Sequence, residues 1–333
     1  MSHTRQVAIL GTGYSVPEAI RGNDDPVFDW IKANRPDESG LFGGLHQRRV
    51  LAHGGDLVRI MGESARAALD QAGLAAADVG MLLGSASVSQ YYSPNDLAVV
   101  HRDLGLSSRC RVMPLNTEYT NFLDGMKLAD DLVRCGTIEN ALVVCGNNWT
   151  HHMDYREPVG HLASDGAGAA VVGWSSAPRD FHLIDWDNET RTDYFGVLRM
   201  APRLSDVTGP LGEPLFSPNL MKVDDAQGTT AIREFGMKQP PIVIERLLSK
   251  HGLTGADVTL ISHQSSGRVF AHWRDAIQPA QYVNTILEFG DMVSASVPVT
   301  LARCFDQIQT DKLVLMGIGQ EMRVTVLLYG RAR

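Results

Sequence analysis

The segment RVMPLNTEYTNFLDGM, residues 111–126, predicts an apolar strand that runs through a polar turn into the first turns of a helix. Such a turn presents a nucleophile in many α/β enzymes, because its tip is exposed and the helix N-terminus stabilises developing negative charge. Here the tip carries Glu118 and Tyr119, and it contains neither cysteine nor serine. A phenol, with a pKa of about 10, is a poor nucleophile at neutral pH, so a tyrosyl ester intermediate is not expected.

The elements that must position this turn alternate between short apolar strands and amphipathic helices. Strand candidates are VAILGTG, VGMLLGSAS and NALVVCGNN, and helix candidates are LVRIMGESARAALDQAGL and NFLDGMKLADDLVRCG. This alternation predicts an α/β protein with buried, partly parallel strands, the first of which ends at its glycines. A strand after the Gly/Ala-rich segment SDGAGAAVV closes the first half, so we expect two domain-sized halves, residues 1–175 and 176–333.

The second half repeats this rhythm. The stretches KLADDLVRCGTIENALVVCGN and VIERLLSKHGLTGADVTLISHQ each read as a helix, a glycine and a buried strand, which favours an internal duplication. Residues 190–230 are rich in Pro, Gly, Asp and Ser and predict a long loop. A loop of this length suits a substrate-facing lid or a partner contact.

Composition excludes several classes of function. The 333 residues include 38 acidic and 30 basic side chains, which argues against nucleic-acid binding. No stretch approaches the roughly 18 apolar residues of a membrane span, so we expect a soluble, cytoplasmic protein. The 4 cysteines have no CxxC spacing and are expected to be reduced thiols.

The segment WTHHMDYREPVGH groups His151, His152, Asp154 and His161, which raises the possibility of a metal site. Adjacent histidines point to opposite sides of a strand or about 100° apart on a helix, so the usual facial ligand spacing is missing. We therefore predict a loop without a metal. GTGYSVPE lacks the GxGxxG spacing of a dinucleotide site, and no resident cofactor is expected.

Four stretches in order, ILGTGYSVPE, DWI with GLHQRRV, SDGAGAAVV, and SHQSS with FGDMVSASVP, together resemble the ketoacyl synthase III branch of the thiolase fold. The resemblance extends from about residue 7 to 330. It implies a five-layered αβαβα fold with two duplicated halves and a homodimer. It also implies that the substrate is a thioester of coenzyme A or of the phosphopantetheine arm of an acyl-carrier protein.

That family uses a Cys-His-Asn site for decarboxylative condensation. In this sequence the three positions fall on Tyr119, His263 and Asp291, so two of them have changed. An ionised aspartate only accepts hydrogen bonds and would repel an enolate, which disfavours condensation. It can instead accept from one ring nitrogen of His263 and increase the basicity of the other, which suits proton removal from a hydroxyl or amine.

Other site residues follow from the same resemblance. Trp30, Arg48 and Arg156 are expected to hold the phosphates or adenine of coenzyme A or the phosphopantetheine arm, and backbone amides near Gly317 and Gly319 are expected to stabilise an oxyanion. Glu118 is expected to face the site as a substrate-binding residue. Tyr119 either bonds a substrate carbonyl, closes the acyl channel, or only packs.

These inferences predict an acyltransferase of specialised metabolism, such as polyketide biosynthesis, related to a natural-product branch that uses a Cys-His-Asp set. It would move an acyl group from a coenzyme A or carrier-protein thioester to a small hydroxyl or amine acceptor without a covalent acyl-enzyme. The alternatives are a non-catalytic ketosynthase-like partner subunit, a non-covalent condensing enzyme and a thioester hydrolase.

Overall fold

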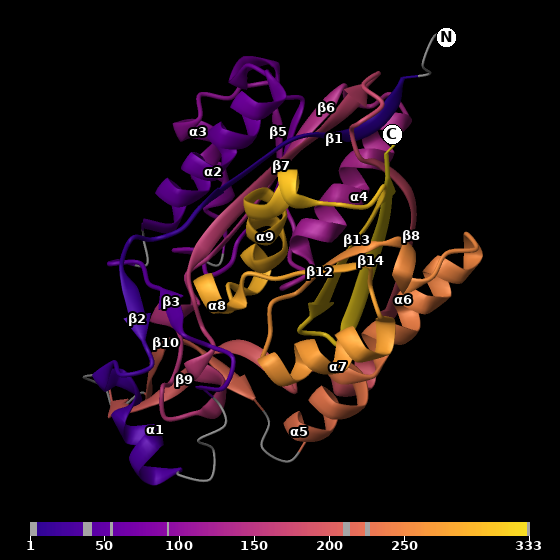
Figure 1. The fold of residues 1–333 in the computed structure, drawn as a ribbon. Helices are drawn as coiled ribbons and strands as arrows, with labels where there is room; N and C mark the ends of the chain where they lie inside the picture. Colours follow the sequence, from indigo (N-terminus) through magenta and orange to yellow (C-terminus); the bar gives the residue numbers. More distant parts are fainter. Residues whose placement is uncertain are drawn as a thin grey trace.

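The computed structural model describes residues 5–35, 42–53, 56–91, 93–208, 214–223 and 227–331. Across these residues the dominant feature is a 10-stranded mixed sheet (Figure 1). In spatial order its strands are β12 (Gln281–Val283), β11 (Thr259–Ser262), β13 (Lys312–Gly319), β14 (Arg323–Gly330), β8 (His182–Thr190), β1 (Gln6–Ser15), β7 (Gly166–Ser175), β6 (Asn140–Asn147), β4 (Met81–Ala86) and β5 (Arg111–Pro114).

The sheet consists of two equivalent sets of strands that meet at β1 and β8. In the first set, β4 is parallel to β5 and β6, β6 is antiparallel to β7, and β7 is antiparallel to β1. In the second set, β11 is parallel to β12 and β13, β13 is antiparallel to β14, and β14 is antiparallel to β8. The expected duplication is therefore confirmed, while the domain boundary at residue 175 stays a prediction.

Helices pack on both outer faces of the sheet and between its two halves (Figure 1). The first outer layer contains α2 and α3, the second contains α6 and α7, and the middle layer contains α4 and α9, as the predicted αβαβα order requires. The helices are α1 (Asp29–Asn34), α2 (Leu57–Ala72), α3 (Leu97–Asp103), α4 (Asn121–Arg134), α5 (Gly228–Ala231), α6 (Gln239–Lys250), α7 (Gly267–Ile277), α8 (Ile286–Phe289) and α9 (Ser296–Cys304).

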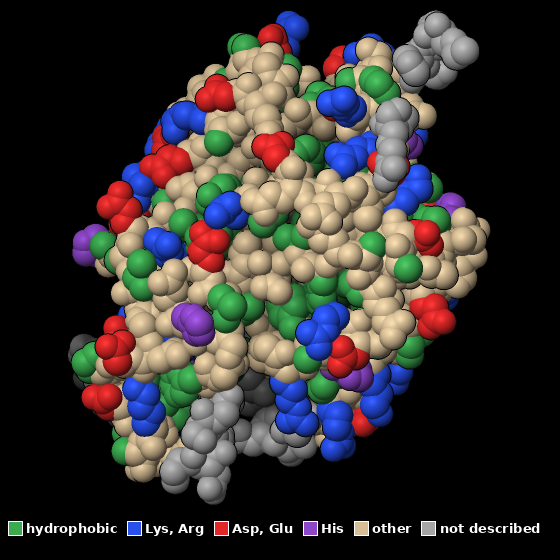
Figure 2. Space-filling view, viewed as in Figure 1, with side chains coloured by type: hydrophobic (Ala, Val, Ile, Leu, Met, Phe, Trp, Pro, Cys, Tyr) green, Lys and Arg blue, Asp and Glu red, His purple; other side chains and the backbone are tan. Residues whose placement is uncertain are grey.

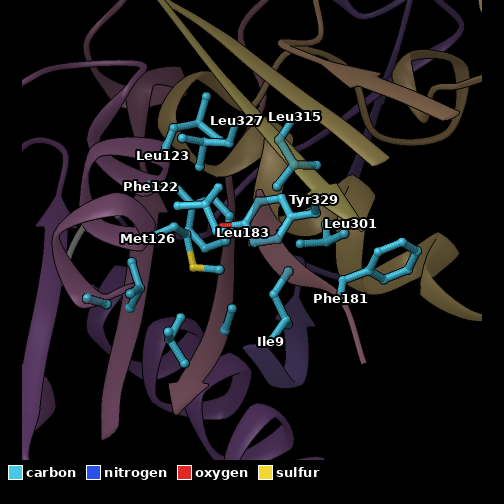
Figure 3. Close-up of a cluster of buried hydrophobic side chains, with 14 of the residues drawn as sticks. Ile9, Phe122, Leu123, Met126, Phe181, Leu183, Leu301, Leu315, Leu327 and Tyr329 are labelled. Carbon is cyan, nitrogen blue, oxygen red and sulfur yellow. The ribbon is translucent and has the colours of Figure 1, made fainter. Parts of the chain in front are cut away.

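The middle layer forms the largest apolar cluster. Phe122, Leu123 and Met126 of α4 and Leu301 of α9 contact side chains of both halves of the sheet, including Leu327 of β14 (Figure 3). Because α4 is covered on both sides, its first turn is fixed against the second half of the chain. This packing brings the turn before α4 to the boundary between the halves.

The duplication pairs different helices from those compared in the sequence. Residues 127–147 contain α4 and β6, and residues 243–264 contain α6 and β11. The strand order instead makes α2 and β4 the counterparts of α6 and β11. The helix–glycine–strand layout is common to every such unit of an α/β protein, so the layout alone could not select the equivalent pair.

The glycines of VAILGTGYS do not end the first strand, as the sequence had suggested. β1 continues through Gly11 and Gly13 to Ser15, because α2 lies directly on these two residues. A Cβ atom on Gly13 would lie 2.2 Å from the Ser64 carbonyl oxygen. The glycines therefore allow close contact between helix and strand rather than a turn.

The predicted loop of residues 190–230 is also wrong in part. β9 (Leu198–Thr208) and β10 (Pro214–Val223) pair as an antiparallel two-stranded sheet. A second small sheet pairs β2 (Ile20–Gly22) with β3 (Gln47–Arg49). Polar and glycine-rich composition masked strands that pair with each other outside the main sheet.

The face shown in Figure 2 mixes Lys and Arg with Asp and Glu over its whole extent. The excess of acidic residues is therefore not gathered into one region of this face. Within the described parts of the chain, no helix combines the length and the apolar character that crossing a bilayer requires.

Candidate active site

The turn between β5 and α4 holds Tyr119 in a left-handed conformation with φ of 73°. A non-glycine residue with positive φ is uncommon and persists only where its surroundings fix it. Here the rings of Trp149 and His263 meet the tyrosine ring edge to face, with centroids 5.4 and 5.1 Å away. Burial, assisted by the negative charges of Asp291 and Glu118, raises the pKa of Tyr119 well above its ordinary value. The phenol is therefore neutral and not nucleophilic near pH 7.

His263 and Asp291 come together from separate segments, as predicted. His263 directly follows β11, and its backbone amide donates to the carbonyl of Met316 at 2.7 Å. Its Nε2 lies 3.5 Å from Oδ2 of Asp291, and both residues are buried. Its Nδ1 is also buried and has no hydrogen-bond partner among the described residues. The ring thus has one nitrogen at a carboxylate and one available.

The carboxylate of Asp291 is held by its own turn. Its Oδ1 accepts from the backbone amide of Val293 at 2.8 Å and from the Ser296 hydroxyl at 3.2 Å. On the other side, the Ser164 hydroxyl donates to the Phe289 carbonyl. Ser164 is the serine of the SDGAGAAVV segment, and it fixes the approach of the chain to Asp291.

Glu118 directly precedes the tyrosine in the same turn. Its Oε1 accepts from the Ser87 hydroxyl at 2.7 Å. The Ser294 hydroxyl lies near the same carboxyl and also near the Gly146 carbonyl, 3.5 Å away, so it can donate to either. Burial raises the pKa of Glu118 to about 7, although both hydroxyls favour the ionised form. The Ser87 oxygen also accepts from the indole of Trp149 at 2.6 Å, so the acid and the aromatic cluster form one network.

A cavity of about 2520 Å³ opens beside β5. This exceeds the roughly 300–1,000 Å³ of a typical small-ligand pocket. Glu118 is among its lining residues, whereas Tyr119, His263 and Asp291 are not among the described residues that line it. Other lining side chains used below are those of Ser87, Asp103, Phe195, Gln320 and Glu321.

The predicted phosphate-binding residues have different environments. Trp30 of α1 is 45% exposed, and Arg156 is largely exposed but paired with Asp154, with Nη2 2.7 Å from Oδ2. Arg48 is fully buried, stacks on Phe28 with 4.9 Å to the ring centroid, and donates to the His161 carbonyl at 2.6 Å. Burial lowers the pKa of Arg48 to about 10. In this structure the head group is buried and supports the fold, and its predicted role in phosphate binding stays a prediction.

Gly317 and Gly319 belong to β13 rather than to a loop. Both pair with β14, and a Cβ atom on Gly317 would lie 2.9 Å from Leu123 and 3.5 Å from the Tyr119 carbonyl oxygen. Pairing with β11 ends at Met316, so the opposite edge of β13 faces the tyrosine turn from Gly317 onward. This placement is compatible with the predicted oxyanion role, which stays a prediction.

None of the four cysteines lies in the tyrosine turn, although Cys145 of β6 is near enough to Glu118 to feel its charge. Cys110, Cys145 and Cys304 are buried, and burial raises the pKa of each thiol. Cys135 is exposed, and a hydrogen bond to Thr137 lowers its pKa, but it follows the last residue of the 14-residue helix α4. At 1.5 Å per residue that is about 21 Å from the first turn. The described residues also contain no group of three or more side chains that could hold a metal.

Sequence analysis missed several residues of the site, namely Ser87, Trp149, Ser294 and Ser296. The two serines follow Asp291 in the quoted FGDMVSASVP segment, so their proximity to it was a usable signal. Ser87 and Trp149 carried no such signal, because only the fold brings them to Glu118.

Comparisons with known proteins agree with this architecture. Residues 113–191 match the family model of 3-oxoacyl-[acyl-carrier-protein] synthase III, and residues 248–329 match the model of its C-terminal part. β-Ketoacyl-[acyl-carrier-protein] synthase III of Sodalis glossinidius is 28% identical over 324 residues, covering 92% of this chain and 94% of the relative. The enzyme of that name from Pseudomonas aeruginosa LESB58 is 28% identical over 330 residues, covering 95% and 93%.

Solved structures share the fold at lower identity. The 3-oxoacyl-(acyl carrier protein) synthase III of Pseudomonas aeruginosa PAO1 has a TM-score of 0.80 and 24% identity, with 98% of this chain and 99% of that chain covered. The priming β-ketosynthase of the R1128 polyketide pathway has a TM-score of 0.83 and 21% identity, with 100% and 98% covered. Cerulenin-bound OleA of Xanthomonas campestris has a TM-score of 0.82 and 19% identity, with 99% of each chain covered.

The fold and the residues at the boundary between its halves define a thiolase-fold protein. More narrowly, the chain is similar to ketoacyl synthase III proteins in both matched regions and, at 28% identity, along nearly its whole length.

Proposed function

We propose that this protein is an acyltransferase that moves an acyl group from a coenzyme A or acyl-carrier-protein thioester to a hydroxyl or amine acceptor. His263 acts as the general base, Asp291 orients it, and no covalent acyl-enzyme forms. The similarity to acyl-carrier-protein synthases supports the thioester substrate, and the R1128 priming ketosynthase supports a role in specialised biosynthesis.

The observation that carries this proposal is the contact between His263 Nε2 and Asp291 Oδ2 at 3.5 Å. An ionised aspartate offers no donor for an enolate oxygen, but it stabilises the imidazolium that forms when His263 accepts a proton. Because the backbone amide of Val293 holds the other carboxylate oxygen, the orientation of Asp291 is fixed before substrate binds.

The transfer then needs a single attack. His263 accepts the acceptor proton while the nucleophile forms its bond to the thioester carbonyl carbon. Amides at the free edge of β13, near Gly317 and Gly319, stabilise the oxyanion. The C–S bond breaks, and the leaving thiolate takes the proton from His263. Tyr119 supplies the wall of the reaction space and stays protonated.

The proposal extends to a homodimer. β5 is the last strand of the sheet, so one of its edges is free for another strand, and Phe195 beside the neighbouring cavity is 82% exposed. Free strand edges and exposed aromatic side chains are typical of surfaces that pair with another chain.

The decisive experiment is acyl transfer by Asp291→Asn, with Glu245→Gln as a control that removes an exposed carboxylate of α6. Slow transfer by the asparagine variant alone supports the base-orienting role, because an amide cannot stabilise the imidazolium. A condensing enzyme predicts the opposite, since asparagine provides the donor that an enolate needs. Unchanged or faster transfer would exclude our assignment.

One observation favours a second candidate, the non-catalytic partner subunit. The ring of Tyr119 covers His263, and neither residue lines the large cavity. Folded wild-type protein that transfers no acyl group to water, hydroxyl or amine would support that candidate.

A further inference from the structure

Two titratable side chains lie next to Tyr119, Glu118 in the same turn and His263 after β11. Of these two, Glu118 lines the cavity and His263 does not. The Glu118 carboxyl is close to the Asp291 turn, because Ser294, three residues after Asp291, lies near it and can donate to it. The backbone carbonyl of Glu118 also accepts from the Gln320 amide at 3.3 Å, which ties its main chain to the turn after β13. Glu118 is thus held in position by contacts to two other segments, and it lines the cavity.

The donors around Glu118 do not neutralise it. Its partners are the hydroxyls of Ser87 and Ser294, and the charged group that perturbs it is the carboxylate of Glu321. The guanidinium of Arg323 already pairs with Glu321 at 3.3 Å and with Asp124 at 3.2 Å. The arginines that line the cavity have other partners: Arg59 pairs with Glu63, Arg66 donates to the Asp103 carbonyl and Arg199 to the Gly196 carbonyl. Among the described residues an ionised Glu118 therefore has no cationic partner, and a cationic ligand group in the cavity would provide one.

We propose that Glu118 binds the ammonium group of the acyl acceptor and takes its first proton, so that the protein acylates nitrogen rather than oxygen. This inference rests on the proposed function and specifies its acceptor. A pKa near 7 lets the carboxyl give and receive a proton at neutral pH.

The proton balance explains why two groups are needed. An ammonium acceptor gives one proton to the Glu118 carboxylate and becomes a neutral amine. Its lone pair forms the C–N bond at the thioester carbonyl, and the second proton passes from nitrogen to His263. The C–S bond breaks, the thiolate takes that proton, and Glu118 returns its own to water in the cavity. A hydroxyl acceptor loses only one proton, which His263 accepts, so it would not need Glu118 as a second proton acceptor.

The test measures binding without any thioester, so it does not depend on catalysis. Calorimetry with n-butylammonium and with 1-butanol, in buffers of different ionisation enthalpy, gives both affinity and protons exchanged. The variant is Glu118→Gln, and the matched control is Asp103→Asn, which removes another acidic side chain lining the same cavity.

We expect wild type and Asp103→Asn to bind butylammonium about tenfold or more tightly than Glu118→Gln, the usual range for a lost charged hydrogen bond. Binding at pH 6 should release about one proton and at pH 8 almost none, since the carboxylate must be ionised to hold the cation. 1-Butanol should bind all three proteins weakly and without proton release.

No binding of butylammonium, equal affinity for 1-butanol, or unchanged binding by Glu118→Gln would each overturn the inference. These outcomes are distinct from failure of the proposed function. Transfer by the wild type that needs His263 but goes to a hydroxyl, with the same rate in Glu118→Gln, would leave the proposed function in place and exclude this one.

Discussion

The two buried helices start at equivalent points of the two halves, but their first turns carry different chemistry. Tyr119 precedes α4 with φ of 73°, and Val293 precedes α9 with φ of 50°. Neither is glycine, and a β-branched residue is especially rare in this region. Each such conformation costs about 1–3 kcal/mol and is retained only where the surroundings fix it. Both turns thus fix the positions of their side chains at a cost in conformational free energy.

Each turn supplies one carboxyl, and the source of its donors differs. Asp291 accepts from the Val293 amide and the Ser296 hydroxyl, both in its own turn, whereas the 2.7 Å donor to Glu118 is the hydroxyl of Ser87 in a distant segment. A main-chain donor cannot rotate away, so it keeps the carboxylate in one orientation. Hydroxyls can donate or accept, so they serve both protonation states. From this comparison we expect Asp291 to orient His263 and Glu118 to exchange protons.

The largest expected effect is the contribution of Glu118 to the pH dependence of the free energy of unfolding. Since the folded pKa is raised from 4.5 to about 7, the folded state binds more protons than the unfolded state within that window. The free energy of unfolding should therefore fall as pH rises from about 4.5 to 7, by about 3 kcal/mol from this group. Denaturant titrations of wild type and Glu118→Gln should show that the variant lacks this part of the decrease. Parallel pH profiles would contradict the assignment.

The second effect is the contribution of His263 to the rate of acyl transfer. His263→Ala should slow acyl transfer about 10²-fold or more, equivalent to about 2.7 kcal/mol in the barrier. Single-turnover kinetics with the thioester and acceptor that wild type uses would measure it, and circular dichroism would check folding. A loss of less than about tenfold would mean that another group accepts the proton.

A third prediction compares a glycine that is in close contact with a neighbouring helix and a glycine that has free space around it. Gly13→Ala should destabilise the protein by about 1–3 kcal/mol, because the new methyl group meets the Ser64 carbonyl of α2. Gly236→Ala is the matched control, since the nearest atom to its Cβ position is 4.0 Å away. Thermal unfolding should show a lowered midpoint for the first variant only. Equal midpoints would refute close packing of α2 on β1.

The smallest expected effect is on protein mass. Incubation with an acyl thioester should leave no stable adduct at the site, because the Tyr119 phenol is neutral, burial raises the pKa of Cys110, Cys145 and Cys304, and the exposed Cys135 lies at the far end of α4. A Cys135→Ser background removes the remaining exposed thiol. Intact-protein mass spectrometry before and after incubation is the measurement. A stoichiometric acyl shift that disappears in Tyr119→Phe would establish covalent catalysis instead.

Local sequence pattern predicted the regular elements well. In α2, Leu57, Ile60, Met61, Ala65 and Ala68 recur at helical spacing and all face the core, and Gly73 with φ of 63° ends the helix. Strands β4, β6 and β13 are short, fully or largely buried apolar runs that the local sequence reveals, whereas the half-exposed β8 is largely polar. The β9–β10 pair was missed because its residues lack the apolar pattern of strands buried in the main sheet.

The sequence by itself determined which residues the site can use: a tyrosine at a strand-to-helix turn, a histidine after a buried strand, and an aspartate before a buried helix. Tertiary structure alone decided that Glu118 faces the cavity while His263 lies behind Tyr119, and that Arg48 is buried against Phe28. The physical reason is that exposure and proton affinity depend on contacts between segments far apart in the chain, and no local pattern encodes those contacts.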